Sequence, residues 1–323
     1  MTTTVVLYSA DAPDQAIELG SQTLSGLTER QLLWIDLASP SPAEIEAVSS
    51  LVGCSPAELA LAGDDSRPGL VNYGDRFHVC AKAVTLARST EKLVREALTL
   101  VVGRSYVVTV HHADTTFLEQ LRQREKGEST IGALSAESFA ASLLDRLLDT
   151  YFTALDVLVH DIDRVEILIL GRQLPPQNLE LLVAARRRIA DLRRLLKAHR
   201  DVFYGMARPD FVATEHPEAR LHFDALNKHY ERAEDDLETA RDLVVGSFEL
   251  LSTRAAQKTN DTMRVLTFVT VMMGLLALVA GLLGMNFALP LFDTGMRGFL
   301  AVVGAMVVLS AIALAVAKRR GWI

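Results

Sequence analysis

The pattern of hydrophobic and polar positions divides the chain into an alternating first part, a helical middle and an apolar end. In residues 1–130, short runs rich in Val, Leu and aromatic residues alternate with helix-like segments. This alternation predicts an α/β domain with a mixed sheet. The predicted strands are Val5–Tyr8, Leu32–Leu37, Phe77–Val84, Ala97–Val102 and Tyr106–His111.

Three helices are predicted between or after these strands. Ser41-Pro42-Ala43-Glu44 joins a capping serine, a proline and an acid at a helix start, and Ser55-Pro56-Ala57-Glu58 repeats that signature. Asp114–Glu125 is the third helix. His111 and His112 lie close to Asp114 in the sequence and could suggest a metal site, but the sequence offers no third ligand beside the histidine pair. We therefore interpret the two histidines as an ordinary strand end.

Residues 135–215 read as a helical hairpin. Two long helical patterns, 136–171 and 176–206, are separated by Gly171 and a Pro-Pro pair. The first arm is acidic, with Asp145, Asp149, Asp156, Asp161, Asp163 and Glu166. The second arm is basic, with Arg186, Arg187, Arg188, Arg193, Arg194, Lys197 and Arg200. The pattern favours pairing between the two arms over binding of a membrane or nucleic acid.

Residues 216–283 predict a stalk helix that continues into the membrane. From Glu218 to Leu283 no proline interrupts the pattern, which gives a helix about 100 Å long. Its first half repeats small or apolar residues at steps of four and three, a seam typical of helices that pack side by side. The seam consists of Leu226, Tyr230, Ala233, Leu237, Ala240, Val244, Ser247 and Leu251. We expect it to pack against identical helices of other copies.

Two uncharged stretches of 19 residues can each span a bilayer. They are Val265–Leu283, which ends the stalk, and residues 299–317, and each gives about 28 Å of helix. Residues 284–298 form a short loop between them, and residues 318–323 form a basic tail. Lys and Arg flank the cytoplasmic ends of such spans, so both termini are predicted to lie in the cytoplasm, with residues 284–298 outside.

The first span carries a stripe of small or weakly polar residues at the same four-three spacing. The stripe comprises Met263, Thr267, Thr270, Gly274, Ala277, Gly281 and Gly284. Because lipid cannot satisfy polar groups, this face must meet protein or water. Two interpretations remain open at this point. The small residues let helices pack closely, or several copies of the stripe line a shared pore.

Composition excludes several other classes of function. The formal net charge of −7 disfavours nucleic acid as a partner. Cys54 and Cys80 have no ligand-like spacing and suggest a reducing compartment. The N-terminal residues lack the basic start and apolar run of a signal peptide. No phosphate-binding loop, nucleophile elbow or zinc-peptidase helix occurs, so the chain is not expected to be an enzyme.

The end of the first span resembles the CorA-type divalent-cation transporters. The residues that carry this resemblance are Gly284-Met285-Asn286 at the end of the penultimate span, the short loop, the second span and the basic tail. Lys258-Thr259-Asn260 and Met263 before the span extend it. The resemblance implies a homopentamer whose first spans surround a pore, with the second spans outside them. It also implies that Gly284, Met285 and Asn286 form the outer mouth, where Asn286 meets the ion.

Further roles follow from the same resemblance. Asn260 and Met263 match the inner, gating end of the pore, and Thr267, Thr270, Gly274, Ala277 and Gly281 would line it. A ring of neutral amides suits Mg²⁺, which gives up its water reluctantly. The expected function is therefore Mg²⁺ uptake through a homo-oligomeric pore in the inner membrane, with no cofactor besides the transported ion.

The sequence departs from the family pattern in ways that leave the ion open. Leu283 replaces a frequent aromatic, Ala277 replaces a frequent threonine, and a mid-span proline is missing. The outer loop carries one acid, Asp293. One alternative is therefore a Zn²⁺, Co²⁺ or Ni²⁺ transporter of the same architecture, as in the zinc-transporting ZntB branch, with or without proton coupling. An alternative of another class is a membrane-anchored scaffold, in which the stripe only packs helices.

Overall fold

The structure is a computed structural model that describes residues 3–18, 24–28, 30–60, 66–86, 93–112, 115, 117–118, 134–171, 177–211, 217–285 and 295–320. The chain divides into two compact units. The first contains residues 1–166 and 176–247, and the second contains residues 167–175 and 248–323. The first is the α/β domain with its helical layer, and the second contains the two apolar helices.

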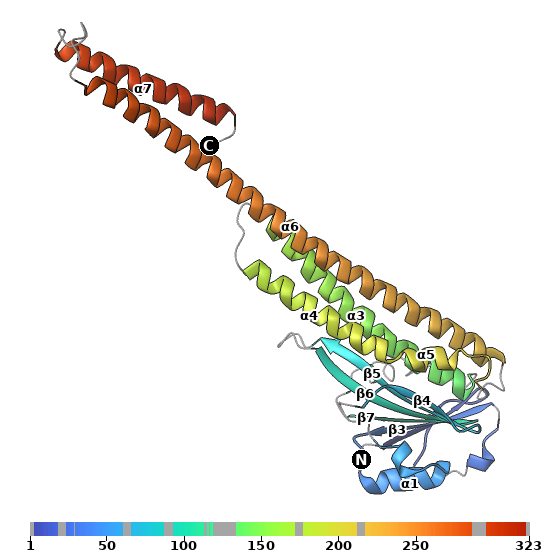
Figure 1. Ribbon diagram of the computed structural model, residues 1–323. Coiled ribbons are helices and arrows are strands. Elements are labelled where there is room, and N and C mark those ends of the chain that lie inside the picture. The colour runs from blue at the N-terminus through green and yellow to red at the C-terminus, as the bar shows by residue number, and fades with distance from the viewer. Residues whose placement is uncertain are drawn as a thin grey trace. The chain divides into compact units, whose positions relative to one another are not determined.

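A seven-stranded sheet forms the centre of the first unit (Figure 1). The strands are β1 Thr3–Ser9, β2 Gln15–Ala16, β3 Gln31–Ala38, β4 Gly69–Asn72, β5 Phe77–Leu86, β6 Leu93–Val102 and β7 Tyr106–His111. Their order is β2-β1-β3-β7-β6-β5-β4, and only the β3–β7 pair is parallel among these neighbours. The predicted mixed sheet is confirmed, and all five predicted strands are present. The short edge strands β2 and β4 were not predicted.

The two serine caps have different outcomes. Ser41 begins helix α1, Pro42–Val52, through the predicted reciprocal bonds: the Glu44 backbone N–H donates to Ser41 Oγ at 3.3 Å, and the Ser41 N–H donates to Glu44 Oε2 at 2.8 Å. Ser55 makes the same capping box but starts only the single 3₁₀ turn η2, Pro56–Glu58. The predicted second helix is therefore wrong, because Leu59 directly after the turn enters the hydrophobic core. The predicted helix Asp114–Glu125 lies almost wholly outside the described residues.

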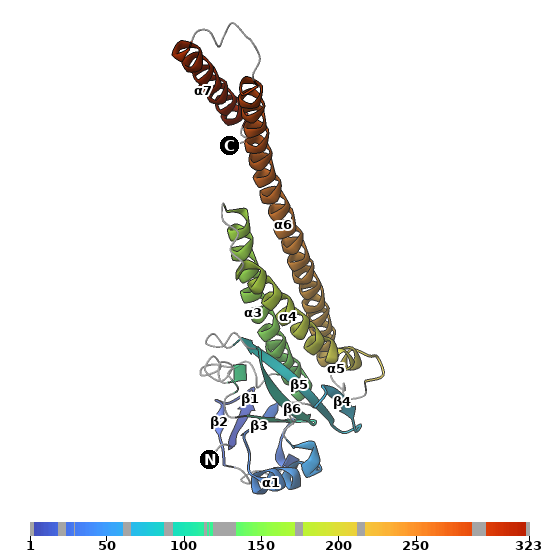
Figure 2. The same ribbon diagram turned by 60° about the vertical axis from the view of Figure 1, so that its left-hand side comes forward.

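Helices cover both faces of the sheet. Figures 1 and 2 show α1 on one face, and α3 Ala136–Leu170, α4 Gln177–Ala198, α5 Arg200–Met206 and the first part of α6 Pro217–Leu283 on the other. On the α1 face, Val48 and Val52 pack with Ile35 and Leu37 of β3. On the other face the ring of Phe139 in α3 meets Trp34, with ring centroids 5.4 Å apart. Alternate residues of β3 therefore serve opposite layers, as strand geometry requires.

The second arm of the predicted hairpin is broken at His199. Residues 176–206 were predicted as one helix, but α4 ends at Ala198 and α5 begins at Arg200. The His199 side chain is fully buried and hydrogen-bonded to the sheet: the Lys82 backbone N–H of β5 donates to its Nε2 at 2.8 Å. Its Nδ1 donates to the Leu195 carbonyl at 2.8 Å. The break lets the end of the arm pack onto β5.

The seam of α6 is buried inside a single copy of the chain. Its residues from Leu226 to Ser247 are at most 3 % exposed, so the expectation that identical neighbours cover the seam is wrong for this stretch. The Tyr230 hydroxyl donates to the Leu196 carbonyl of α4, and the Ser247 hydroxyl donates to Glu166 of α3 at 2.5 Å. The helix therefore lies in the groove between α3 and α4. Small seam residues permit this close approach within one chain.

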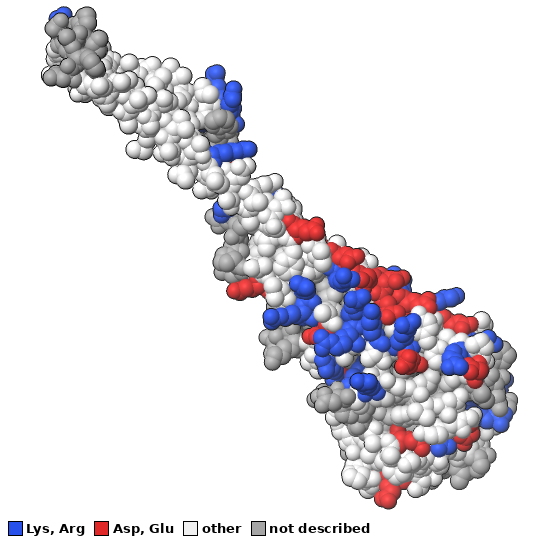
Figure 3. All heavy atoms as spheres, viewed as in Figure 1, with Lys and Arg blue, Asp and Glu red and all other residues white. Residues whose placement is uncertain are grey.

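Two residues of the basic arm form ion pairs outside the acidic arm, contrary to the predicted pairing. Arg193 of α4 forms its ion pair with Glu238 of α6 at 2.6 Å. Arg194 pairs with Asp191 on its own helix at 3.5 Å. Figure 3 shows basic side chains gathered over α4 and acidic side chains along the exposed edge of α6. The third helix competes for the basic residues because it packs beside α4, which the hairpin pattern alone did not reveal.

Candidate functional site

The membrane segment of α6 has two opposite faces. One face is partly buried and consists of Phe268, Met272, Leu276, Val279 and Leu283. The stripe from Met263 to Gly281 is exposed at every position. With about 100° between successive residues, the mean directions of the two faces differ by about 180°. The stripe therefore points away from whatever packs on the partly buried face.

Helix α7, Met296–Arg319, covers the partly buried face. Figures 1 and 2 show α7 running antiparallel beside the end of α6. The side of α7 that is buried or partly buried consists of Gly298, Val302, Met306, Ser310, Ala313 and Ala317. An apolar pocket of about 440 Å³ separates the ends of the helices near Leu283, Gly284 and Phe299. The two spans thus pack as a hairpin that leaves the stripe open.

The small residues of the stripe are not required by packing within one copy. A Cβ atom added at Gly274 or Gly281 would meet nothing within 4 Å. Gly284 ends the helix, and its backbone N–H donates to the Ala280 carbonyl at 2.9 Å. In the described part of a single chain, the space beside the two helical glycines is empty. Packing among the described residues therefore gives no reason for glycine at these two positions.

Polar groups on the stripe are weak and neutral. The Thr270 hydroxyl donates to the Leu266 carbonyl of its own helix at 2.9 Å, which leaves its oxygen lone pairs directed outward as acceptors. Thr267 lies three residues earlier on the same face. Met263 is 61 % exposed at the lower end of the stripe. The surface can therefore meet water without carrying a charge of its own.

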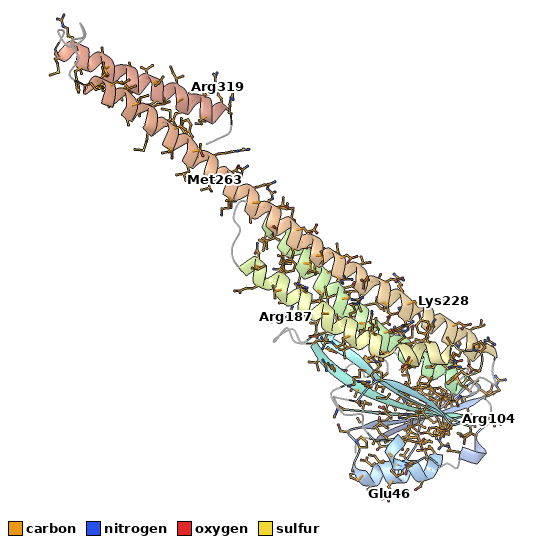
Figure 4. The ribbon with its side chains drawn as sticks, in the orientation of Figure 1. Glu46, Arg104, Arg187, Lys228, Met263 and Arg319 are labelled. Atoms are coloured by element: carbon orange, nitrogen blue, oxygen red, sulfur yellow. The ribbon has the colours of Figure 1, made fainter. Side chains whose placement is uncertain are left out.

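Charge marks one end of the two-helix hairpin. Lys258 and Arg264 lie on α6 near Met263, and Lys318 and Arg319 lie in the last turn of α7. Figure 4 places Arg319 at the same end of the hairpin as Met263. The opposite end carries Met285, which is 48 % exposed. Asn286, the predicted ion-binding residue, lies outside the described residues.

No metal-binding cluster accompanies the stripe in the part of the chain that is described. Among those residues, no group of three or more His, Cys, Asp or Glu side chains could hold a metal ion. Helices α6 and α7 are both long and apolar enough to cross a membrane. The site is therefore a neutral, uncovered helix face on a pair of apolar helices.

Comparison with known proteins decides the family. The sequence model of the family described as CorA-like Mg²⁺ transporter protein matches residues 29–319. The chain belongs to this family. Membership covers both units, so the resemblance predicted from the end of the first span extends over nearly the whole sequence.

Individual relatives agree with this membership. The chain is 24 % identical to the cobalt/magnesium transport protein CorA of Thermotoga maritima, over 90 % of this chain and 83 % of that protein. It is also 24 % identical to the cobalt/magnesium transport protein CorA of Methanocaldococcus jannaschii, over 91 % and 92 %. The complete structure of the M. jannaschii CorA magnesium transporter is similar with a TM-score of 0.73, covering 100 % of this chain and 99 % of that one at 22 % identity.

The similarity to a ZntB structure shows a common fold of the soluble part. The cytoplasmic domain of ZntB from Vibrio parahaemolyticus matches 80 % of this chain and 100 % of its own, with a TM-score of 0.60 and 11 % identity. The family and fold predictions are thereby confirmed: an α/β domain, a long helix and two C-terminal apolar helices of a membrane-embedded divalent-cation transporter, with Mg²⁺ the ion in the family's description.

The structure also adds site residues that the sequence analysis missed. The α7-facing residues Phe268, Met272 and Leu276 lie opposite the stripe and show which way it points, and none of them was among the predicted site residues. Their spacing of four residues was a usable signal. A matching row of small and medium residues on α7, from Gly298 to Ala317, would have identified the partner face.

Proposed function

We propose that this protein carries Mg²⁺ into the cell through a pore lined by the stripes of five copies, the number that the family resemblance implies. The observation that supports the proposal most directly is the position of the stripe. It lies opposite the face covered by α7, and its glycines have open space beside them. Each copy would then contribute Thr267, Thr270, Gly274, Ala277 and Gly281 to the pore wall.

A single stripe cannot conduct an ion. One helix face encloses no water, and its neutral acceptors in lipid would lack partners. Repeating the face around an axis gives every copy the same environment and closes a channel. In this arrangement α7 lies outside the ring of α6 helices. Asn260 and Met263 form the inner end of the pore, where apolar and weakly polar rings close by losing water.

Asn286, with Gly284 and Met285, forms the outer mouth in this proposal. Five carboxamide oxygens accept hydrogen bonds from the water shell of a dication, or replace part of it, without the strong binding of a carboxylate ring. Release then stays fast. The transported ion is the only ion that the pathway needs, and no cofactor or catalytic step is proposed.

The proposed orientation follows the basic residues. The ends near Met263 and Arg319 face the cytoplasm, so both termini and residues 1–130, 135–215 and the start of 216–283 lie inside, and residues 284–298 lie outside the inner membrane. An inside-negative potential then drives uptake without ATP. The gain for a divalent ion is about 4.6 kcal/mol per 100 mV, from about 2.3 kcal/mol per charge.

Ion flux through Asn286→Ala tests the proposal. Purified protein in liposomes should admit Mg²⁺ under an inside-negative potential, and Asn286→Ala should lower that flux by roughly a hundredfold, because every acceptor of the ring is lost. Native mass spectrometry should show the same oligomer for both proteins. Thr294→Ala, in the same loop, is the matched control and should transport normally.

The same assay separates the alternatives. Faster flux of Zn²⁺ than of Mg²⁺, with a response to a pH gradient, would assign the protein to proton-coupled zinc transport instead. No flux of any divalent ion from an intact oligomer would favour a membrane-anchored scaffold. A stable monomer or dimer in mild detergent would contradict the shared pore.

A further inference from the structure

A basic groove runs between α4 and α6 in the first unit. It has a volume of about 490 Å³, and its cationic residues are Arg186, Arg193, Arg194, Lys197 and Arg241. Its apolar floor consists of Ile189, Ala190, Val244 and Val245. Cations on α4 from Arg186 to Lys197 cover about 16 Å of helix. A groove with an apolar floor and a basic rim fits an acidic, amphipathic helix face.

The charges of this groove are only partly neutralised by the chain itself. Glu238 pairs with both Arg193 and Arg241, and Asp191 pairs with Arg194. Arg186 and Lys197 have no ion-pair partner among the described residues. The protein as a whole is acidic, with a net charge of −7, so this local excess of positive charge is not a general property of its surface.

An acidic strip lies on the face of α6 opposite the seam, with Asp235 and Asp242 exposed and Glu231 partly buried and hydrogen-bonded to Asn227. Its central residues are Glu231, Asp235 and Asp242, at steps of four and seven, which places them within about 40° of one another around the helix. Asp235 and Asp242 are exposed and form no side-chain ion pair among the described residues. The strip from Glu231 to Asp242 also covers about 16 Å, the length of the basic row on α4.

We propose that the basic groove of one copy receives the acidic strip of the next copy. The inference rests on the proposed homo-oligomer and specifies its contact between soluble units. Figure 3 shows the two surfaces, red along α6 and blue over α4, on the same unit. A closed ring needs two different, complementary surfaces on each copy, because every copy contacts one neighbour with each. Groove and strip match in length, in charge and in helical spacing.

Cysteine pairing between copies tests the contact. Ala190→Cys places a thiol on the exposed groove floor, and Asp235→Cys places one on the strip. The full-length chain also carries Cys54→Ala, which removes the half-buried native thiol. Two differently tagged forms, each with one of the new thiols, are expressed together and oxidised mildly. A disulfide-linked dimer containing both tags is expected, and either form alone should give none. A chain with both thiols should give a ladder of linked copies.

Charge reversal at adjacent residues gives a matched comparison. Arg186→Glu, in the groove, should lower the yield of the linked dimer by roughly fivefold, because a repulsive pair replaces an attractive one. Arg187→Glu, exposed on another face of α4 and labelled in Figure 4, should leave the yield unchanged. Asp242→Lys on the strip should restore the yield lost in Arg186→Glu. Rising salt should weaken the unmodified contact.

The outcomes separate this inference from the proposed pore. An intact oligomer by native mass spectrometry without linked dimers would overturn the groove-to-strip contact and leave the pore standing. Linked dimers from Ala190→Cys alone would also overturn it, because they require two grooves to face each other. A protein that is monomeric by native mass spectrometry would overturn both.

Discussion

The two halves of α6 carry the same kind of surface and use it differently. Between Leu226 and Ser247, small and apolar residues at steps of four and three are buried by α3 and α4 of the same chain. Between Met263 and Gly281, residues of similar size at the same steps are exposed, with α7 on the opposite face. Periodicity therefore predicts that a face will pack. What it packs against depends on which other elements of the chain can reach it.

The largest effect is expected on Mg²⁺ flux, from a larger side chain on the exposed stripe of α6. Ala277→Leu should lower Mg²⁺ flux by roughly a hundredfold or more, because five larger side chains would narrow the proposed pore. Flux into liposomes measures it. Ala311→Leu, on the exposed side of α7, makes the same change away from α6 and should conduct normally. Equal loss of flux in both variants would contradict the functional difference between the two faces.

Lowering the pH should reduce the free energy of unfolding of the first unit, in which the seam is buried. Burial lowers the pKa of His199 to about 4, and its ring neighbours Phe203, which stacks on Tyr230 of the seam. The unfolded chain takes up a proton near pH 6.5 and the folded chain does not, so stability is complete above pH 6.5 and falls as the pH drops toward 4. The loss should reach roughly 3 kcal/mol.

Chemical denaturation followed by tyrosine and tryptophan fluorescence between pH 7.5 and 4 measures that loss. His199→Gln keeps a hydrogen-bond acceptor at the site and removes the titration. Its stability should therefore change less over the same pH range, although it starts lower at neutral pH. An unchanged slope in His199→Gln would assign the pH dependence to other groups.

A smaller effect is expected from overfilling the buried half. Ala240→Leu inserts three carbon atoms into a seam position that is 1 % exposed, and should destabilise the first unit by about 1–3 kcal/mol. Denaturant titration of the full-length protein in detergent measures it. Ala225→Leu, exposed on the same helix, should change stability by less than about 0.5 kcal/mol. If Ala240→Leu were tolerated as well as Ala225→Leu, the seam would not be closely packed.

The smallest effect is expected at the inner end of the stripe. Met263→Ala should raise the residual Mg²⁺ flux at high internal Mg²⁺ by a few-fold, roughly, because a shorter apolar ring holds back water less well. Flux at zero and at high internal Mg²⁺ measures it. Val269→Ala, 45 % exposed and about 120° from Met263 around the helix, is the control and should close normally. Unchanged closed-state flux in Met263→Ala would remove Met263 from the pore.

Local signals predicted much of the fold. Hydrophobic periodicity, composition and capping chemistry predicted strands β3, β5 and β7, the capped start of α1 and the two apolar helices. These features are decided within about ten residues of sequence. The stripe on α6 was also predicted, because its spacing is visible in the sequence itself. Its role in conduction remains a proposal.

The errors share a physical origin in contacts between distant segments. The break at His199 exists because a backbone N–H of β5, more than a hundred residues earlier, binds the side chain. Ser55 fails to start a helix because Leu59 is drawn into the core. Arg193 forms its ion pair with Glu238 and not with the acidic arm, because α6 packs beside α4. A local sequence pattern does not show which of several compatible distant segments will pack against it.

The unbroken hydrogen bonding of α6 has a mechanical consequence. The helix runs without interruption from Pro217 to Leu283, so the seam and the stripe lie on the same continuous helix. A rod of this kind resists twisting, because a change in twist would strain every backbone hydrogen bond in the stretch that took it up. Within the second unit, a turn of residues 248–262 about the helix axis would therefore reach the stripe as a similar turn. In the proposed pore, torque on this part of the helix opens or closes the ring at Met263 without any hinge.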